Sequence, residues 1–157
     1  MNETAEQIKP QPDDSKLRQF LGYRMKRAWM LIQADLSQAL KPFDLRIVTF
    51  SILQIVVSSP GLRPSQLAET LDIERPNLVA LLDELLRRDL LRKERDSHDR
   101  RAVLLHPTDA GIALCAKAHA AVSDREKHFF NGLSDDAVAQ ASKALTTVVR
   151  NITEPQK

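Results

Sequence analysis

The chain has 157 residues, of which 43% are hydrophobic and 28% are charged, and its formal net charge is +2. This length can bury one hydrophobic core, and a single cysteine excludes an intramolecular disulfide. Glycine is rare and aromatic residues make up only 4%, which favours helices joined by short turns over a sandwich or barrel. No glycine-rich phosphate loop, nucleophile elbow or zinc-binding His-Glu-x-x-His motif is present in the sequence, so we do not expect an enzyme. The N-terminal residues lack a signal pattern and no apolar run could span a bilayer, which predicts a cytoplasmic protein without membrane contact.

The sequence of the N-terminal part predicts a polar arm followed by a long helix. Residues 1–14 are polar and contain Pro10 and Pro12, so we expect a flexible arm. Apolar residues then recur every three or four positions from Leu17 to Leu40, which predicts an amphipathic helix that ends before Pro42. Its apolar face is larger than one small domain needs. A second chain could cover the surplus, and so could later helices of the same chain.

The middle of the chain predicts a helix-turn-helix. Residues 45–58 fit a helix; their β-branched residues also allow a strand, but the turn signal at 59–61 favours the helix. Pro64 can open a short helix that ends near Leu71, because proline is tolerated in a first turn. After a short turn, a second helix follows from Glu74. Its period places Leu78, Leu81, Leu82 and Leu85 on one face and Pro76, Ala80, Asp83 and Arg87 on the other.

A basic β-hairpin is predicted next. Two short apolar patches, Leu90-Leu91 and Ala102 to Leu105, flank a polar tip rich in arginine. Residues 87–101 contain seven basic and four acidic side chains, an excess of three that is larger than the net charge of the whole chain. On charge alone, a solvated loop is as good an interpretation as a nucleic-acid contact. A helix followed by a basic hairpin is, however, the outline of a winged helix-turn-helix, which places a helix in the major groove and a wing arginine at the minor groove.

Two further helices are predicted at the C-terminal end. Thr108 can cap a helix from Asp109 to about Phe130, which Asn131-Gly132 ends. Ser134 can cap a last helix, for which we expect a buried stripe of six apolar residues: Val138, Ala141, Leu145, Val148, Val149 and Ile152.

Several of these segments together resemble the MarR family of bacterial transcriptional regulators over nearly the whole chain. The matching pieces are Ser59-Pro60-Gly61, Ser65-x-Leu67-Ala68-x-x-Leu71-x-Ile73, Leu81-Leu82-Asp83-x-Leu85, Leu90-Leu91-x-x-x-x-Asp96, Asp99-Arg100-Arg101-Ala102 and Thr108-x-x-Gly111. The resemblance implies a mainly α fold with a small β-hairpin wing, in which a winged helix-turn-helix core is flanked by long N- and C-terminal dimerisation helices. It also implies a homodimer on a pseudo-palindromic double-stranded DNA operator, and repression that a small ligand or an oxidant relieves.

The expected domain organisation follows from this resemblance. Residues 15–157 would form a single MarR-like domain after the arm at 1–14. Within it, residues 15–41 and 108–157 would be the dimerisation helices and residues 45–107 the DNA-binding unit.

Candidate DNA-binding residues lie on the two helices of the motif, mainly the second, and on the wing. Arg75 suits a bidentate contact with guanine, and Asn77 suits adenine or a phosphate, whereas ordinary exposed helix surface is the alternative for both. Two departures from the family pattern stand out: Val79-Ala80 replaces a polar or basic pair, and Asp89 occupies a position that is commonly glycine. The candidates are Ser65, Glu74, Arg75, Pro76, Asn77, Ala80, Arg87, Arg88, Arg95, Asp99, Arg100 and Arg101.

The resemblance also implies a cleft for a small ligand, and the candidate effector-binding residues lie on elements that could line it. An arginine near aromatic side chains suits an anionic aromatic ligand, although core packing is the commoner use of such aromatics. The candidates are Tyr23, Arg27, Trp29, Met30, Gln33, Phe50, Cys115 and His119. We expect Cys115 to be a small buried hydrophobic residue rather than a redox sensor. The histidine spacing predicts no metal site, and no cofactor is expected.

The competing interpretation is a winged-helix protein that binds DNA without sequence preference or binds a protein partner, with no effector control. The ratio of specific to non-specific DNA affinity separates the two.

Overall fold

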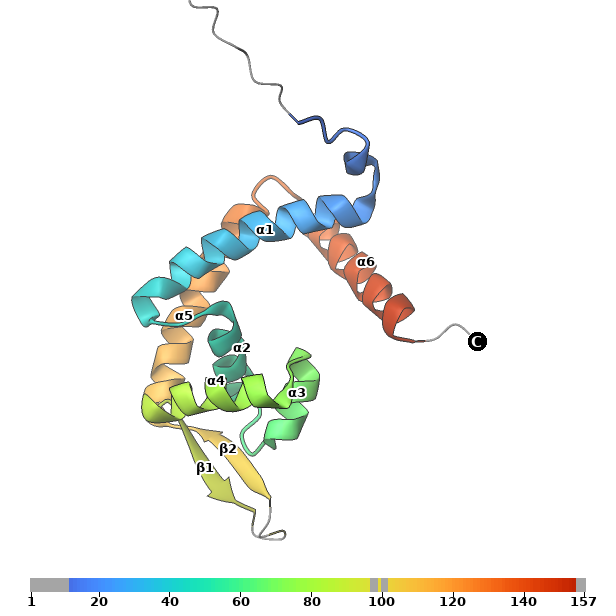
Figure 1. Cartoon of the computed structure of the whole chain (residues 1–157). Helices are drawn as coiled ribbons and strands as arrows, with labels where there is room; N and C mark the ends of the chain where they lie inside the picture. The colour runs from blue at the N-terminus through green and yellow to red at the C-terminus, as the bar shows by residue number, and fades with distance from the viewer. Residues whose placement is uncertain (1–11, 97–98, 100–101, 155–157) are drawn as a thin grey trace, which may run out of the picture. The chain divides into compact units, whose positions relative to one another are not determined.

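The computed structural model describes residues 12–96, 99 and 102–154. The described residues form helices and one β-hairpin (Figure 1). In chain order these are the 3-10 helix η1 (Leu17–Gln19), α1 (Leu21–Leu40), the 3-10 helix η2 (Lys41–Phe43), α2 (Ile47–Ser58), α3 (Pro64–Leu71), α4 (Arg75–Arg87), β1 (Leu91–Arg95), β2 (Val103–Pro107), α5 (Asp109–Phe129) and α6 (Asp135–Thr153). The mainly α fold with a hairpin wing is therefore confirmed. Of the helices described, none is long and apolar enough to cross a bilayer.

The chain divides into two units, Met1–Ala34 and Asp35–Lys157, whose relative placement is not determined. The division falls inside α1 rather than at residue 14. The domain bounds expected from the sequence therefore stay a prediction. In the first unit, η1 precedes a helix that begins at Leu21, four residues later than its apolar period suggests, because Phe20 is extended.

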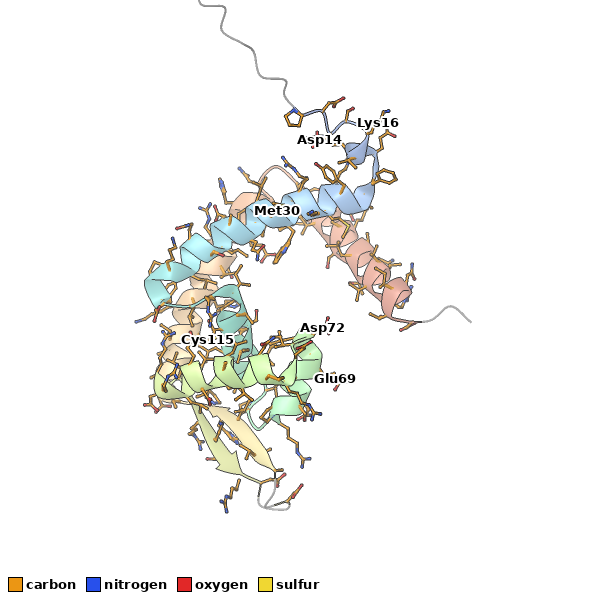
Figure 2. The ribbon with its side chains drawn as sticks, in the orientation of Figure 1. Asp14, Lys16, Met30, Glu69, Asp72 and Cys115 are labelled. Atoms are coloured by element: carbon orange, nitrogen blue, oxygen red, sulfur yellow. The ribbon has the colours of Figure 1, made fainter. Side chains whose placement is uncertain are left out.

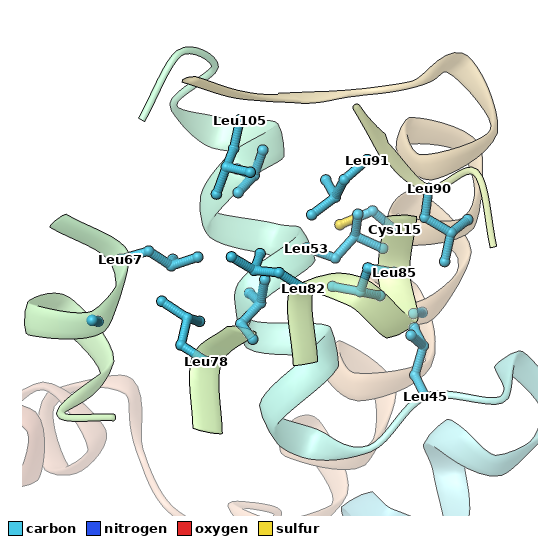
Figure 3. Packing of buried hydrophobic residues seen from close by; sticks show 14 of the residues in the cluster. Leu45, Leu53, Leu67, Leu78, Leu82, Leu85, Leu90, Leu91, Leu105 and Cys115 are labelled. Carbon is cyan, nitrogen blue, oxygen red and sulfur yellow. The ribbon is translucent and has the colours of Figure 1, made fainter. Parts of the chain in front are cut away.

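The core of the second unit is built around α2. Ile52, Leu53 and Val56 of this helix are fully buried, and α2 contacts α5, β2 and α4. A helix that is apolar on all sides has to be surrounded by other elements. Here α5, β2 and α4 pack around α2, so this segment is stable as a helix despite its β-branched residues. Figure 3 shows leucines of α2, α4 and the hairpin strands converging with Cys115 of α5.

The wing is an antiparallel pair in which Leu91 faces Pro107 and Arg95 faces Val103. Its second strand also joins the segment before α3. The Gly61 amide donates to the Leu105 carbonyl, and the Leu105 amide donates to the Leu62 carbonyl, both at 2.8 Å. The wing is therefore attached by its backbone to the helix-turn-helix.

Three aspartates occupy left-handed backbone positions. Asp44, Asp72 and Asp89 have φ values of 51, 50 and 53°, and they follow η2, α3 and α4. Asparagine and aspartate tolerate this region better than other side chains, although glycine adopts it at lower cost. Asp89 thus takes a left-handed turn conformation, which glycine adopts most readily, at the position where the family resemblance implied a glycine.

The expected buried stripe on α6 is wrong for the single chain. No residue of α6 is buried, and Leu145, Val149 and Ile152 are 48, 60 and 78% exposed. The helix is amphipathic as predicted, and Ser134 caps it by accepting a hydrogen bond from the Ala137 amide. Among the described residues of the second unit, no other element packs over α6 closely enough to bury one of its side chains.

Candidate nucleic-acid interface and effector-binding residues

The start of α4 presents an exposed face beside α3. Glu74, Arg75, Pro76 and Asn77 are exposed, whereas Leu78, in the next position, is buried at 2% exposure. Val79 and Ala80 are exposed one turn later. Leu78, Leu82 and Leu85 anchor the opposite face, so the period predicted from the sequence is confirmed, with Leu81 half-buried at its edge.

Ser65 of α3 and Arg75 of α4 line the same shallow depression. Its floor is apolar and includes Leu78, Val79 and Leu82. Ser65 and Arg75 are both candidate DNA-binding residues, and the structure brings them together across the turn at 72–74. A second depression, which also includes Ser65 and Arg75, is lined by the acidic residues Glu69, Asp72 and Glu74. Figure 2 labels Glu69 on α3 and Asp72 directly after it. Arg75 is the basic residue among those that line these two depressions. Most of the positive charge that attracts a nucleic acid therefore has to come from other parts of the chain.

The N-terminus of α4 leaves amide donors available. Glu74 is the N-cap residue with extended backbone, and within the described chain its side chain accepts no hydrogen bond from the first turn. Pro76 lies in that turn, where its missing amide costs nothing. Uncapped amides and the helix dipole favour an anion such as a phosphate at this end.

The wing carries exposed basic residues along β1. Arg92, Lys93 and Arg95 are exposed; Lys93 lies 3.7 Å from Asp83 of α4, and Arg92 pairs with Glu94. Asp99 is exposed, and its carbonyl accepts the Ala102 amide at 2.8 Å. Arg100 and Arg101, expected at the wing tip, lie outside the described residues.

The two arginines at the end of α4 differ in their surroundings. Arg87 is exposed, as a phosphate contact requires. Arg88 instead donates from its guanidinium to the carbonyls of Phe43, at 2.9 Å, and Asp44. These hydrogen bonds hold the segment between α1 and α2, and the phosphate contact expected of Arg88 stays a prediction.

Thr108 and Gly111 fix the exit from the wing into α5. The Thr108 hydroxyl donates to the Asp89 carbonyl at 2.6 Å and accepts from the Gly111 amide at 3.0 Å. A Cβ atom at Gly111 would lie 2.0 Å from the Leu90 carbonyl oxygen. The spacing Thr108-x-x-Gly111 therefore combines a helix cap with a position where the backbone leaves no room for a side chain.

One residue of this region was missed by the sequence analysis. Arg63 is the N-cap residue of α3, and its guanidinium lies 3.4 Å from Asp96 and 3.9 Å from Asp99. Its position directly before the helix-opening Pro64 was the available signal. The contact with residues more than thirty positions later could not be read from the sequence.

The candidate effector residues are divided between the two units. In the first, Arg27, Trp29, Met30 and Gln33 are exposed, with Trp29 at 50% and Met30 at 53%. Tyr23 is half-buried and donates its hydroxyl to Asp14 at 2.8 Å. This hydrogen bond raises the pKa of Tyr23 above its ordinary value, and the Arg18 guanidinium together with the Tyr23 hydroxyl lowers the pKa of Asp14.

In the second unit, Gln54 joins two of the expected residues. Its amide oxygen lies 3.4 Å from the Cys115 sulfur, which donates to it, and 3.1 Å from His119 Nδ1. Cys115 is 2% exposed, and burial raises the pKa of its thiol. A buried thiol with a raised pKa is a poor nucleophile, which confirms the expectation of a small buried residue and gives no support to a redox sensor. Phe50 is half-buried and His119 is exposed. Of the residues described, no three His, Cys, Asp or Glu side chains are grouped to hold a metal ion.

Comparison with known proteins decides the family. The sequence model of the MarR family matches residues 43–102, which include the helix-turn-helix and most of the wing. The structure is similar to that of the transcriptional repressor CouR bound to a 23-mer DNA duplex, with 34% identity and a TM-score of 0.84 over 90% of this chain and 100% of that chain. This chain belongs to the MarR family. The family consists of transcriptional regulators, and the matched region contains the face of α4 described above.

Two other MarR-type relatives extend the comparison. CouR from Rhodococcus jostii RHA1, in a crystal structure with p-coumaroyl-CoA bound, is 27% identical with a TM-score of 0.76, over 90% of this chain and 96% of that one. A Thauera aromatica protein that is named as a transcriptional regulatory protein for the hcr operon is 31% identical over 86 residues. That alignment covers 55% of this MarR-family chain and 52% of the relative, so this chain matches about half of that protein's length.

Proposed function

We propose that this MarR-family protein is a sequence-specific transcriptional repressor that acts as a homodimer on a pseudo-palindromic operator and is released by a small ligand. The observation that carries the proposal is the exposed N-terminal half of α4. It presents Arg75 beside Ser65 and leaves Asn77 exposed, on a fold similar to that of a repressor bound to DNA. We propose no catalytic activity for this protein.

Each DNA contact has a distinct physical role. Arg75 would bind guanine with two parallel hydrogen bonds, and Asn77 would bind adenine or a phosphate. Val79 and Ala80 would contact thymine methyl groups. Arg87 and Arg95 would bind phosphates, and the wing arginines Arg100 and Arg101 would enter the narrow, strongly negative minor groove.

DNA binding is tested by fluorescence anisotropy with DNA from upstream of the protein's own gene and with scrambled DNA, each at two salt concentrations. We expect a specific affinity roughly a thousandfold or more above the non-specific affinity. Equal, weak and strongly salt-dependent binding to both DNAs would instead support the alternative of non-specific binding.

Arg75 and Arg87 provide a matched pair for the same assay. Arg75→Ala should cost about 1 to 3 kcal/mol on the operator and reduce sequence preference. Arg87→Ala should weaken binding to all sequences alike and lower the salt slope by about one. If Arg75→Ala left specificity intact, the proposed reading face would be wrong.

We propose an aromatic acid or its CoA thioester as the effector class. Two observations support it: a relative named CouR binds p-coumaroyl-CoA, and α1 of this chain exposes both a cation, Arg27, and a large aromatic ring, Trp29. A guanidinium suits a carboxylate or phosphate, and an aromatic surface suits an aryl group.

Trp29 is the only tryptophan, so ligand binding near it can be followed by its fluorescence. We expect p-coumaroyl-CoA to change this fluorescence and to release the operator, and coenzyme A alone to do neither at the same concentration. Arg27→Gln should weaken the ligand response about tenfold, as the loss of a charged hydrogen bond implies. Release by neither p-coumaroyl-CoA nor free p-coumarate would contradict this effector class, while the DNA-binding proposal would be unaffected.

A further inference from the structure

The junction between α3 and the wing contains an ion cluster that the DNA contacts proposed above do not use. Arg63 precedes α3, and its guanidinium lies between the wing carboxylates of Asp96, at 3.4 Å, and Asp99, at 3.9 Å. The Arg63 amide donates to the Gln66 side chain at 2.9 Å, so the backbone that carries the guanidinium is fixed to the first turn of α3.

Among the described residues, backbone hydrogen bonds hold this junction on the β2 side. Leu62, directly before Arg63, accepts the Leu105 amide of β2. On the β1 side, Asp96 follows the last residue of the strand and donates its amide to Ala102 across the hairpin turn. Arg63 is therefore the side chain that links α3 to the end of β1, while the backbone links the preceding segment to β2.

The carboxylates of Asp96 and Asp99 are electrostatically unfavourable on a surface that approaches DNA. An acidic side chain near phosphates normally lowers affinity, because like charges repel over about a Debye length. The Asp96 side chain is 18% exposed, and Arg63 contacts its carboxylate from the side of α3. These carboxylates therefore have a use that offsets their repulsion of DNA.

We propose that Arg63 is a positioning residue for the wing: by binding Asp96 and Asp99 it sets the position of the end of β1 relative to α3 and α4. This inference rests on the proposed function, since it concerns how the wing meets the same DNA. Orientation matters because the wing tip and the start of α4 must reach their grooves together.

The alternative role for Arg63 is a direct phosphate contact, and Asp96 separates the two. If Arg63 binds phosphate, Asp96→Asn removes a repulsive charge and raises operator affinity or leaves it unchanged. If Arg63 positions the wing through Asp96, the same substitution lowers affinity although it removes a negative charge.

The experiment measures operator and scrambled-DNA affinity for the full chain and for Arg63→Gln, Asp96→Asn and the double variant. We expect each single variant to lose about fivefold in operator affinity, the upper range for a half-exposed ion pair, and the double variant to lose no more than either. Unchanged or higher affinity for Asp96→Asn, or additive losses, would overturn the proposal. Lys117→Gln on α5 is the charge-matched control for Arg63→Gln and should bind like the unaltered chain.

A second measurement needs no DNA. Hydrogen exchange of the Asp96 and Ala102 amides should accelerate about fivefold in Arg63→Gln while exchange in the buried part of α2 is unchanged. Unaltered exchange at the wing would overturn the positioning role. Failure of the unaltered chain to distinguish operator from scrambled DNA would contradict the proposed function instead, and this exchange measurement would still test the link between Arg63 and the wing.

Discussion

Individual side chains determine how α4, the wing and α5 meet. Asp89 turns the chain in the left-handed region, its carbonyl accepts the Thr108 hydroxyl, and Gly111 brings the first turn of α5 against Leu90. Arg88, next to this turn, holds the carbonyls of Phe43 and Asp44. The exit of α4 is therefore fixed by contacts that also set where the wing begins.

Gly111→Ala should destabilise the fold, because the new Cβ would lie 2.0 Å from a backbone oxygen that cannot move independently. We expect a loss of about 2 to 3 kcal/mol in the free energy of unfolding, comparable to overpacking a core. Urea denaturation monitored by circular dichroism measures it. Gly22→Ala in α1 is the matched control: nothing lies within 4 Å of its Cβ position, and it should leave stability unchanged or raise it by up to about 1 kcal/mol. Equal effects of the two substitutions would contradict the close approach.

At the scale of elements, an ion pair ties α1 to α5. Arg125 donates two hydrogen bonds to the Asp35 carboxylate, and its guanidinium lies 5.8 Å from the centre of the Phe129 ring. Paired hydrogen bonds of this kind fix the geometry as well as adding attraction. Asp35 is ninety positions from Arg125 in the sequence, so this pair is one of the long-range contacts inside the second unit, which includes the end of α1.

This pair predicts a pH dependence of stability. The Arg125 guanidinium lowers the pKa of Asp35 below its ordinary value of 3.8. A group with a lower pKa in the folded state stabilises the fold above its unfolded pKa, and this contribution is lost as pH falls through the folded value. The melting temperature of Asp35→Asn should therefore lie below that of the unaltered chain at neutral pH, and the gap should close on acidification below about pH 3.8. A gap that is independent of pH would contradict this account. Asp124→Asn, which removes an exposed pair with Lys127 on the same helix, should leave the melting temperature nearly unchanged.

At the scale of the whole molecule, the described residues leave apolar side chains of both terminal helices exposed. Leu145, Val149 and Ile152 of α6 are exposed, and so are Leu21 and Leu31 of α1. Exposed apolar faces of this length usually mark interaction surfaces. A second copy of the chain fits the proposed homodimer and a two-fold symmetric operator.

Leu145→Glu tests that assembly. We expect dissociation to monomers in analytical ultracentrifugation and a large loss of operator affinity, because a charge would be buried in the subunit interface. The side chain is exposed in the single chain, so the helical content of the monomer should change little. Gln140→Glu on the opposite side of α6 makes the same change in net charge and should remain dimeric. A dimeric Leu145→Glu would place the interface elsewhere.

The sequence by itself determined the elements of this protein, because its signals are local. Leucine spacing in α4, the apolar patches around the basic wing tip, Pro64 in a first turn and the capping residues Thr108 and Ser134 all act within a few positions of the chain. Their order was enough to predict the winged helix-turn-helix and the exposed start of α4.

Only the tertiary structure decided which apolar faces are covered and which polar side chains form hydrogen bonds or ion pairs. Periodicity shows that α6 has an apolar face and cannot show what packs on it, so the predicted burial was wrong. It also cannot show that Arg88 binds the carbonyls of Phe43 and Asp44, that Gln54 meets Cys115 and His119, or that Arg63 meets Asp96 thirty-three positions later. These contacts join residues that are distant in the chain, and they form because the packing of α2 against α4, β2 and α5 brings those elements together.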